Sequence, residues 1–374
     1  MSHPIVDVGK VALQPATWPP LVGEVLGCSD YLQKIIECIN EVGEFPKRDL
    51  VNFALANKFF VNPVMDTVWK TMHTLTPFFL LFPVALTSYS NGTKARPLRA
   101  FLYHLWIWAY HTSPIQIIMT RVPATSDETF NSYAYRLRHL AFKKDVRSEN
   151  LPPLSVIRLA LLQPNGIPFF PRLESLSFSY FEVSQATAAY TELIALSPIT
   201  KLELTDLHTE TATFVTVLSL FSLRFSGALK ELRMRMPDPG RAFTMESLRF
   251  LPHLTDLTTL SITCPYPHFP IYDLLKWITG LRNLETLEID VRPRLTAPVI
   301  AGLRSEAQSL RFLRIGGPFG FIMSVLRMFT DIGECIELAP SRATTELEDT
   351  EIIMYVERTF SPSPELLWKE LPEL

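Results

Sequence analysis

One apolar pattern recurs at nearly constant intervals between residues 137 and 315, and it constrains the fold more than any other feature. Each copy reads apolar-x-x-apolar-x-apolar, as in Leu173, Leu176 and Phe178. From Leu173 onward the copies start 26 to 30 residues apart. Such regular spacing indicates a repeat architecture. The other copies start at Leu137, Ile199, Leu229, Leu257, Leu284 and Leu310.

One copy can supply one short strand with its spaced apolar side chains pointing inward, while the following segment returns over the other side. The spacing is close to the ~20–29 residues of a leucine-rich repeat. We therefore predict an α/β fold, an irregular leucine-rich-repeat horseshoe with parallel inner strands and outer helices. An ordinary α/β sheet of βα units is the alternative. The expected helices are 183–196, 212–223, 272–278 and 296–305.

Residues that alternate with the buried positions would line the concave face of such a horseshoe. They carry both signs of charge, which suits a protein surface better than a small molecule. For any single residue, an ordinary solvated position is the alternative. We expect substrate-binding side chains at Lys201, Glu203, Glu231, Arg233, Arg235, Ser261, Glu288, Asp290 and Arg314.

The segment 30–72 has the pattern of three short helices. Leu32, Ile35, Ile36 and Ile39 are spaced by three and four residues and form one apolar stripe. Asp49 can cap a second helix, which we expect to end or kink at Pro63 before a third helix. Three short helices bury their own apolar faces poorly, so an interface with a partner is expected.

The residue order of this segment resembles the F-box. Asp49-Leu50, Lys58-Phe59-Phe60 and Val68-Trp69 follow the order and approximate spacing of the family's motif. The family usually opens with Leu-Pro, where this chain has Asp30-Tyr31-Leu32. The run 130–140 resembles the junction that fungal, basidiomycete-type F-box proteins place before their repeats.

The chain is thus similar to F-box/leucine-rich-repeat proteins, which implies a substrate-receptor subunit of an SCF-type cullin ubiquitin ligase. The F-box would bind a Skp-family adaptor and the repeats a protein substrate, so the chain would not be an enzyme. A repeat scaffold without a ligase role, whose N-terminal helices are only a cap, is the alternative. The resemblance implies adaptor contacts at Leu50, Val51, Phe53, Leu55, Phe59, Val68 and Trp69.

The patterns divide the chain into five segments. An irregular segment 1–29 precedes the F-box-like helices 30–72. A helical connecting region 73–130 then leads to the repeats 131–340 and to a C-terminal cap or tail, 341–374.

Charge and motifs narrow the function further. With 35 basic and 38 acidic residues the chain has no field that would favour nucleic acid or a membrane as partner. Its four cysteines show no CxxC pair, which favours an intracellular, cytoplasmic or nuclear location. No hydrolase elbow, zinc-protease helix, Walker loop or dinucleotide fingerprint occurs, so we expect no catalytic residues, cofactor or metal.

Overall fold

The structure is a computed structural model in which the chain divides into two compact units, Met1–Val68 and Trp69–Leu374. We call them the N-terminal unit and the sheet unit. The structure describes residues 29–42, 46–75, 77–78, 85–89, 115–119, 128–142, 167–179, 192–205, 219, 221–225, 227–235, 248–264, 271–291, 302–307, 310–329, 331–340, 346–360 and 364–368.

The N-terminal unit contains the helices α2 (Ser29–Val42), α3 (Pro46–Ala56) and α4 (Lys58–Lys70), whose last two residues belong to the sheet unit. Leu32 and Ile36 of the predicted apolar stripe are buried, as are Leu50 and Ala54 of α3. The rings of Phe53 and Phe60 stack with centroids 4.5 Å apart. The expected amphipathic pattern therefore describes how these helices bury their apolar sides.

The second helix ends before Asn57, so the expectation that it would end at Pro63 was wrong. The side-chain oxygen of Asn57 accepts a hydrogen bond from the backbone N–H of Phe59 (3.1 Å), and its carbonyl accepts one from Phe60 (2.9 Å). Asn57 thus caps the start of α4. Helix α4 continues through Pro63, although a proline beyond the first turn cannot donate the backbone hydrogen bond to the preceding turn.

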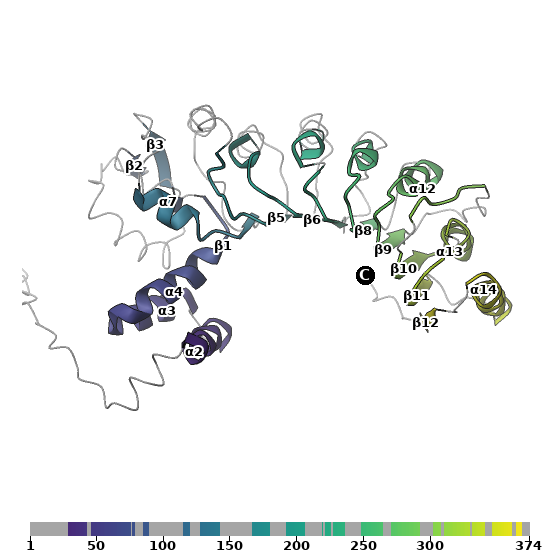
Figure 1. Ribbon diagram of the computed structural model, residues 1–374, viewed down its shortest axis with the longest axis horizontal. Helices are drawn as coiled ribbons and strands as arrows, with labels where there is room; N and C mark the ends of the chain where they lie inside the picture. The colour runs from purple at the N-terminus through teal and green to yellow at the C-terminus, as the bar shows by residue number, and fades with distance from the viewer. Residues whose placement is uncertain are drawn as a thin grey trace, which may run out of the picture. The chain divides into compact units, whose positions relative to one another are not determined.

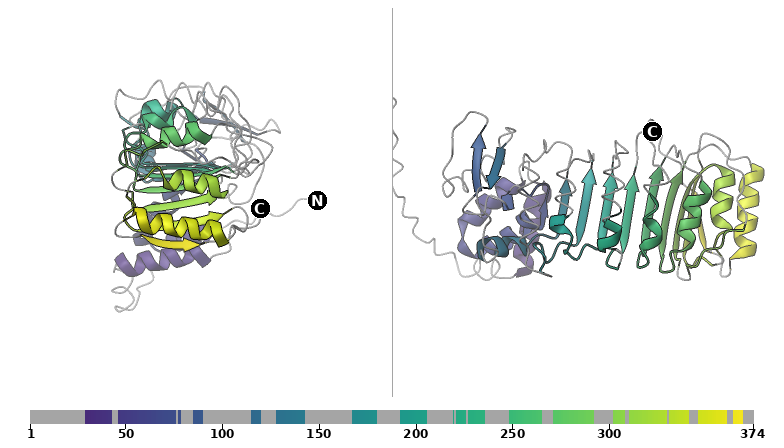
Figure 2. Two further views of the ribbon diagram at one scale, coloured as in Figure 1. Left: turned by 90° about the vertical axis from the view of Figure 1, so that its right-hand side faces the viewer. Right: turned by 90° about the horizontal axis from the view of Figure 1, so that it is seen from above.

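The sheet unit contains an open, all-parallel sheet of ten strands (Figures 1 and 2). Apart from β2 and β3, spatial order follows chain order, so each new strand is added beside the previous one. The prediction of an α/β fold with stacked parallel strands is confirmed. The strands are β1 (Thr71–Met72), β4 (His139–Phe142), β5 (Ser175–Ser179), β6 (Lys201–Thr205), β7 (Glu231–Arg235), β8 (Thr259–Cys264), β9 (Thr286–Val291), β10 (Phe312–Gly317), β11 (Cys335–Pro340) and β12 (Glu365–Trp368).

Helices lie on one side of this sheet. In Figure 1 the strands follow an arc, and α12 (Ile271–Thr279), α13 (Phe319–Leu326) and α14 (Glu346–Thr359) lie on its outer side. The sheet unit also contains the short helix α7 (Glu128–Ala134) and the 3-10 turn η1 (Leu251–His253). The predicted helix 272–278 is confirmed by α12. The described part of 296–305 is not helical, because Gly302 takes the left-handed conformation with φ of 89°.

The strands stack so that the middle apolar residue of each copy pairs with its counterpart in the next. The resulting row is at most 1% exposed along its whole length. No single repeat could bury this row alone, since each member is covered by its neighbours. The row consists of Leu140, Leu176, Leu202, Leu232, Leu260, Leu287, Leu313 and Ile336.

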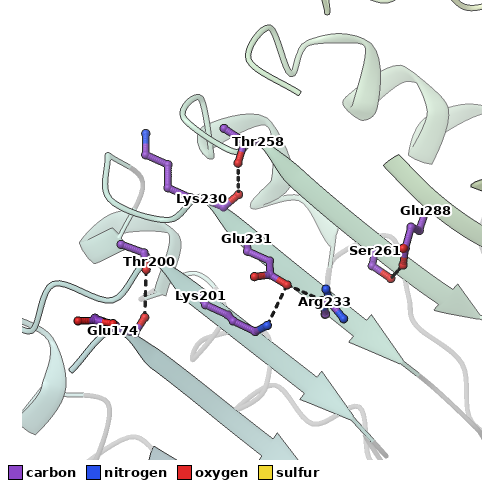
Figure 3. A network of polar contacts seen from close by, with 9 residues as sticks. All are labelled: Glu174, Thr200, Lys201, Lys230, Glu231, Arg233, Thr258, Ser261 and Glu288. Carbon is purple, nitrogen blue, oxygen red and sulfur yellow. Dashed lines mark hydrogen bonds and ion pairs between the residues drawn. The ribbon is translucent and has the colours of Figure 1, made fainter. Parts of the chain in front are cut away.

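Paired backbone hydrogen bonds join neighbouring repeats at the start of strands β5 to β11. The carbonyl of Glu174 accepts the backbone N–H groups of both Thr200 and Lys201, at 2.9 and 3.0 Å. The hydroxyl of Thr200 also donates to this carbonyl, as that of Thr258 does to the carbonyl of Lys230 (Figure 3). These paired bonds hold neighbouring repeats in one register. The backbone carbonyls that accept two N–H groups in the same way are those of Arg138, Thr200, Lys230, Thr258, Glu285 and Arg311.

The sheet extends beyond the predicted repeat region on both sides. Strand β1 lies before it, and α14 and β12 continue the strand–helix alternation into the segment predicted as a cap or tail. Within the connecting region, for which a helical or mixed layer was expected, β2 (Ala85–Tyr89) and β3 (Ile115–Met119) are strands that pair antiparallel. The second of these segments is rich in β-branched isoleucine, which favours a strand.

Truncating one residue of the buried row should destabilise the protein strongly. We expect Leu260→Ala to lower the free energy of unfolding by about 2–5 kcal/mol, because it leaves a cavity between two strands. Leu223→Ala is the matched control, since Leu223 is 77% exposed and its truncation should change stability by less than about 0.5 kcal/mol. Urea denaturation of both variants measures the difference, and equal effects would contradict the packing described.

Gly317 should not tolerate a side chain. Its φ is 146°, and an added Cβ would lie 2.5 Å from the carbonyl oxygen of Val291 and 2.9 Å from the ring of Phe321. We expect Gly317→Ala to cost at least about 1–3 kcal/mol in unfolding free energy from backbone strain. At Gly227 an added Cβ would meet no atom within 4 Å. Gly227→Ala should therefore leave the midpoint of thermal unfolding nearly unchanged.

Candidate protein-interaction surface

The side chains that alternate with the buried positions of β4 to β12 form one surface, which we call the open face. All nine predicted substrate-binding residues lie on it, within strands β6 to β10. The parallel register places them in rows across the strands. One row contains Glu203, Arg233, Ser261, Glu288 and Arg314. Their placement on one face is confirmed, and their binding role stays a prediction.

Glu231 is the centre of an ion-pair cluster on β6 and β7. Its carboxylate lies 3.0 Å from the ammonium of Lys201 and also accepts a hydrogen bond from the guanidinium of Arg233 (Figure 3). Partial burial opposes ionisation of Glu231, but the hydrogen bonds and positive charges of Lys201 and Arg233 outweigh it. The pKa of the Glu231 carboxyl is therefore lowered below its usual range.

Two further contacts order side chains toward the other end of the face. The hydroxyl of Ser261 donates to the carboxylate of Glu288 at 2.8 Å. The guanidinium of Arg314 lies 2.9 Å from the carboxylate of Glu337 on the next strand. Each contact joins adjacent repeats, so the charged rows are ordered by the same register that aligns the core.

Asp290 and Arg235 end their strands in different surroundings. A Cβ added at Gly316 would lie 2.7 Å from a carboxylate oxygen of Asp290, so this carboxylate covers the position where Gly316 lacks a side chain. Arg235 is exposed and stands in register between Thr205 and Thr263. Both residues belong to the row nearest the carboxyl ends of the strands.

The open face extends to residues that were not predicted as binding residues. Glu337, Glu365 and Leu367 continue its rows on β11 and β12, and Phe312 is 45% exposed on β10. The alternation Ile336-Glu337-Leu338 repeats the strand pattern and could have identified Glu337. Residues 365–368 carry no complete copy of the repeat motif, so nothing in the sequence marked them as a strand.

The seven predicted adaptor contacts do not form one exposed surface. Leu55 and Phe59 are 77% and 72% exposed, and Val51 and Phe53 are partly exposed. Leu50, Val68 and Trp69 are buried. In the sheet unit the ring of Trp69 packs against Tyr133 at 4.5 Å and Phe78 at 4.9 Å between centroids. These three residues are therefore core residues of this chain, because an aromatic or aliphatic side chain that is covered cannot also serve as a surface contact.

The chemistry available on the described part of the face is that of charges and hydrogen bonds. No group of three or more His, Cys, Asp or Glu residues that could hold a metal ion occurs among the described residues. Burial, together with the positive charge of Lys70, lowers the pKa of His139 on β4. Within the described residues, no helix has both the length and the apolar character that crossing a bilayer requires.

No protein-family model matches its sequence, and no curated protein matches it significantly.

Removing the charge of Glu231 should affect stability in a pH-dependent way. A lowered folded-state pKa means that the carboxylate stabilises the fold above its unfolded pKa of about 4.5, and that this contribution is lost as pH falls through the folded value. We expect Glu231→Gln to reduce the unfolding free energy at pH 7 by up to about 1 kcal/mol, since the pair is partly solvated. The difference from wild type should shrink below about pH 4.5.

Glu203→Gln is the control for this prediction, because Glu203 forms no ion pair with another described residue. Urea titrations at several pH values measure both variants. A constant difference between Glu231→Gln and wild type from pH 7 to pH 3.5 would contradict the proposed ion-pair stabilisation.

Proposed function

We propose that this chain is a substrate-receptor subunit of an SCF-type cullin ubiquitin ligase, with a leucine-rich-repeat sheet that holds a protein substrate. The observation that carries the proposal is the open face, where ordered charges of both signs lie on a stack of short parallel strands. Surfaces of this kind suit a partner with an extended, mixed-charge surface.

The spacing and register of the strands support the leucine-rich-repeat part of the proposal. Consecutive strands add in chain order, and the apolar ladder is buried from Leu140 to Ile336. An ordinary α/β sheet with crossovers in both directions would change strand order along the sheet. The simple order β4 to β12 therefore favours a repeat array over that alternative.

The N-terminal unit supports an adaptor-binding role through its exposed apolar side chains. Leu55 and Phe59 lie close in sequence at the end of α3 and the start of α4, and Tyr31 is 56% exposed on α2. Several large apolar side chains exposed on so small a unit favour a protein interface. Together with the F-box-like order of residues 48–70, this makes a Skp-family adaptor the proposed partner.

In this proposal the chain acts by positioning. The adaptor links the N-terminal unit to the ligase while the open face holds the substrate, so that substrate lysines are kept at high local concentration near the conjugating enzyme. The chain itself needs two binding surfaces and no nucleophile.

A leucine-rich-repeat scaffold without a ligase role is the second candidate. The burial of Trp69, Leu50 and Val68 favours it, because part of the F-box-like motif serves the core of this chain. Adaptor binding distinguishes the two candidates.

Replacing both exposed apolar residues should abolish adaptor binding. We expect Leu55→Asp combined with Phe59→Asp to reduce co-purification of a Skp-family adaptor at least tenfold, because two apolar anchors would be replaced by solvated charges. Both side chains are largely exposed, so the variant should unfold at the wild-type urea concentration.

Leu223→Asp is the matched control, because this side chain is also 77% exposed but lies in the sheet unit. It should leave adaptor recovery unchanged. No adaptor recovered with the wild-type chain, or equal recovery with the double variant, would favour the scaffold.

A further inference from the structure

The parallel sheet ends differently at its two edges. At the first edge the buried apolar row begins with Met72 of β1, which pairs in register with Leu140 and is only 2% exposed. At the last edge the row continues from Ile336 to Leu366 of β12, which is in register with it but only partly buried. Since β12 is the last strand of the sheet, the apolar row is covered at its first end and open at its last.

The backbone of β12 has hydrogen-bonding groups that point away from the sheet at this open edge. The N–H of Glu365 donates to the carbonyl of Glu334 at 2.9 Å, so the backbone groups of Glu365 face β11. Because these groups alternate in direction along a strand, the N–H and C=O of Leu366 and Trp368 face the other way. No strand among the described residues pairs with β12 on that side. The edge can therefore accept an additional strand.

Helix α14 presents an apolar side chain at the same end of the array. It follows α13 along the arc of strands (Figure 1). The ring of Tyr355 lies 5.8 Å from the guanidinium of Arg327 at the C-terminal end of α13, so this flank of α14 faces α13. Ile353 lies two residues earlier, about 200° around the helix axis, and is 37% exposed. The flank of α14 that faces away from α13 thus carries an exposed apolar side chain.

An apolar side chain of β12 is exposed on the open face as well, because Leu367 is 39% exposed. We call the surface formed by Ile353, Leu366 and Leu367 the free end. Repeat arrays in water normally end in a repeat whose outer side is polar. Apolar side chains around an unpaired strand edge, on both the strand and the helix of the last described repeat, instead indicate an interface.

We propose that the free end binds a second copy of this chain, with the two β12 strands paired antiparallel about a twofold axis. A head-to-tail array would need an open apolar row at both edges, and the row is covered at Met72. Within this chain the surface that matches one free end is therefore another free end. Such an interface is closed, because each copy uses the same residues. This proposal does not depend on the proposed function.

The composition of β12 selects the register of the two strands. Pro364 has no N–H, so a register that places it opposite an edge-facing residue loses hydrogen bonds. With the axis at Leu367, Leu366 of each copy pairs with Trp368 of the other, and all edge-facing backbone groups of these two residues are bonded. Leu367 then lies opposite Leu367 of the second copy. The exposed leucine of the open face is thereby covered by its own counterpart.

A second copy also covers the helix side of the free end. A twofold axis perpendicular to the sheet keeps the helices of both copies on one side, so the flank of α14 that carries Ile353 faces the α14 of the second copy. Leu366 is covered on that side by the added strand. A single extended peptide would pair with β12 but would leave Ile353 exposed. The strand and the helix together therefore favour a second copy over a peptide.

Sedimentation equilibrium of the full chain, without any adaptor, tests the proposal between about 1 and 100 µM, the range of a weak to moderate interface. We expect the mass to rise from 42.6 kDa toward twice that value. Leu367→Lys should raise the dissociation constant about tenfold or more, because two like charges would lie directly opposite. Leu366→Pro should do the same by removing an edge-facing N–H, with the bonds to β11 kept. Leu223→Lys, at a side chain that is 77% exposed, is the matched control and should dimerise as wild type does.

A cysteine at the axis tests the register. Opposite residues in a pair without mutual hydrogen bonds have Cα atoms about 4.5 Å apart, a distance that a disulfide can join. We expect Leu367→Cys to form a covalent dimer under mild oxidation, measured on a denaturing gel without reductant. Phe312→Cys is the control, because Phe312 is 45% exposed on the open face but lies on β10. The wild-type chain, in which Cys38 is exposed, gives the background.

Three results would overturn the proposal. The first is a monomer at every concentration, and the second is a mass that grows beyond the dimer, as a head-to-tail array would give. The third is unchanged dimerisation in both Leu367→Lys and Leu366→Pro, which would place the interface elsewhere. The double variant Leu55→Asp and Phe59→Asp should dimerise as wild type does, so this assay and the adaptor assay can fail separately.

Discussion

Parallel pairing between successive strands is the constraint on which the sheet unit depends. Each strand presents two or three apolar side chains that only the next repeat can cover, as Leu260 lies between Leu232 and Leu287. Before each of the strands β5 to β11, one carbonyl of the preceding repeat accepts two N–H groups. Burial and hydrogen bonding therefore require the same register, and a slip by one residue would expose the whole apolar row.

The same register creates the surface to which a function can be assigned. Because side chains alternate along a strand, aligning the leucines also aligns the polar residues between them into rows. Ion pairs such as Arg314–Glu337 then form between neighbouring repeats. A binding surface with ordered charges, such as the β6–β7 cluster around Glu231, follows from the packing of the core.

The sequence predicted the elements that recur periodically. It did not predict elements whose bounds or type depend on opposing local preferences. The recurring apolar residues predicted β4 to β10, and alternation predicted the open-face residues from Lys201 to Arg314. The break in the N-terminal helices was misplaced because capping by Asn57 outweighs the cost of Pro63 within α4. Strands β2 and β3 were missed because apolar composition alone does not distinguish a helix from a strand.

The sequence by itself determined the repeat, its approximate period, the strands that carry it and the alternation of buried and polar residues. These are local properties, set by side-chain chemistry at fixed spacing. The tertiary structure decided which apolar residues are covered: Trp69 packs on Tyr133 and Phe78, while Leu55 and Phe59 are exposed. It also decided how charges pair, because Glu231 meets Lys201 only when two strands 30 residues apart in sequence lie side by side. Burial and ion pairing are contacts between distant segments, and a linear pattern does not contain them.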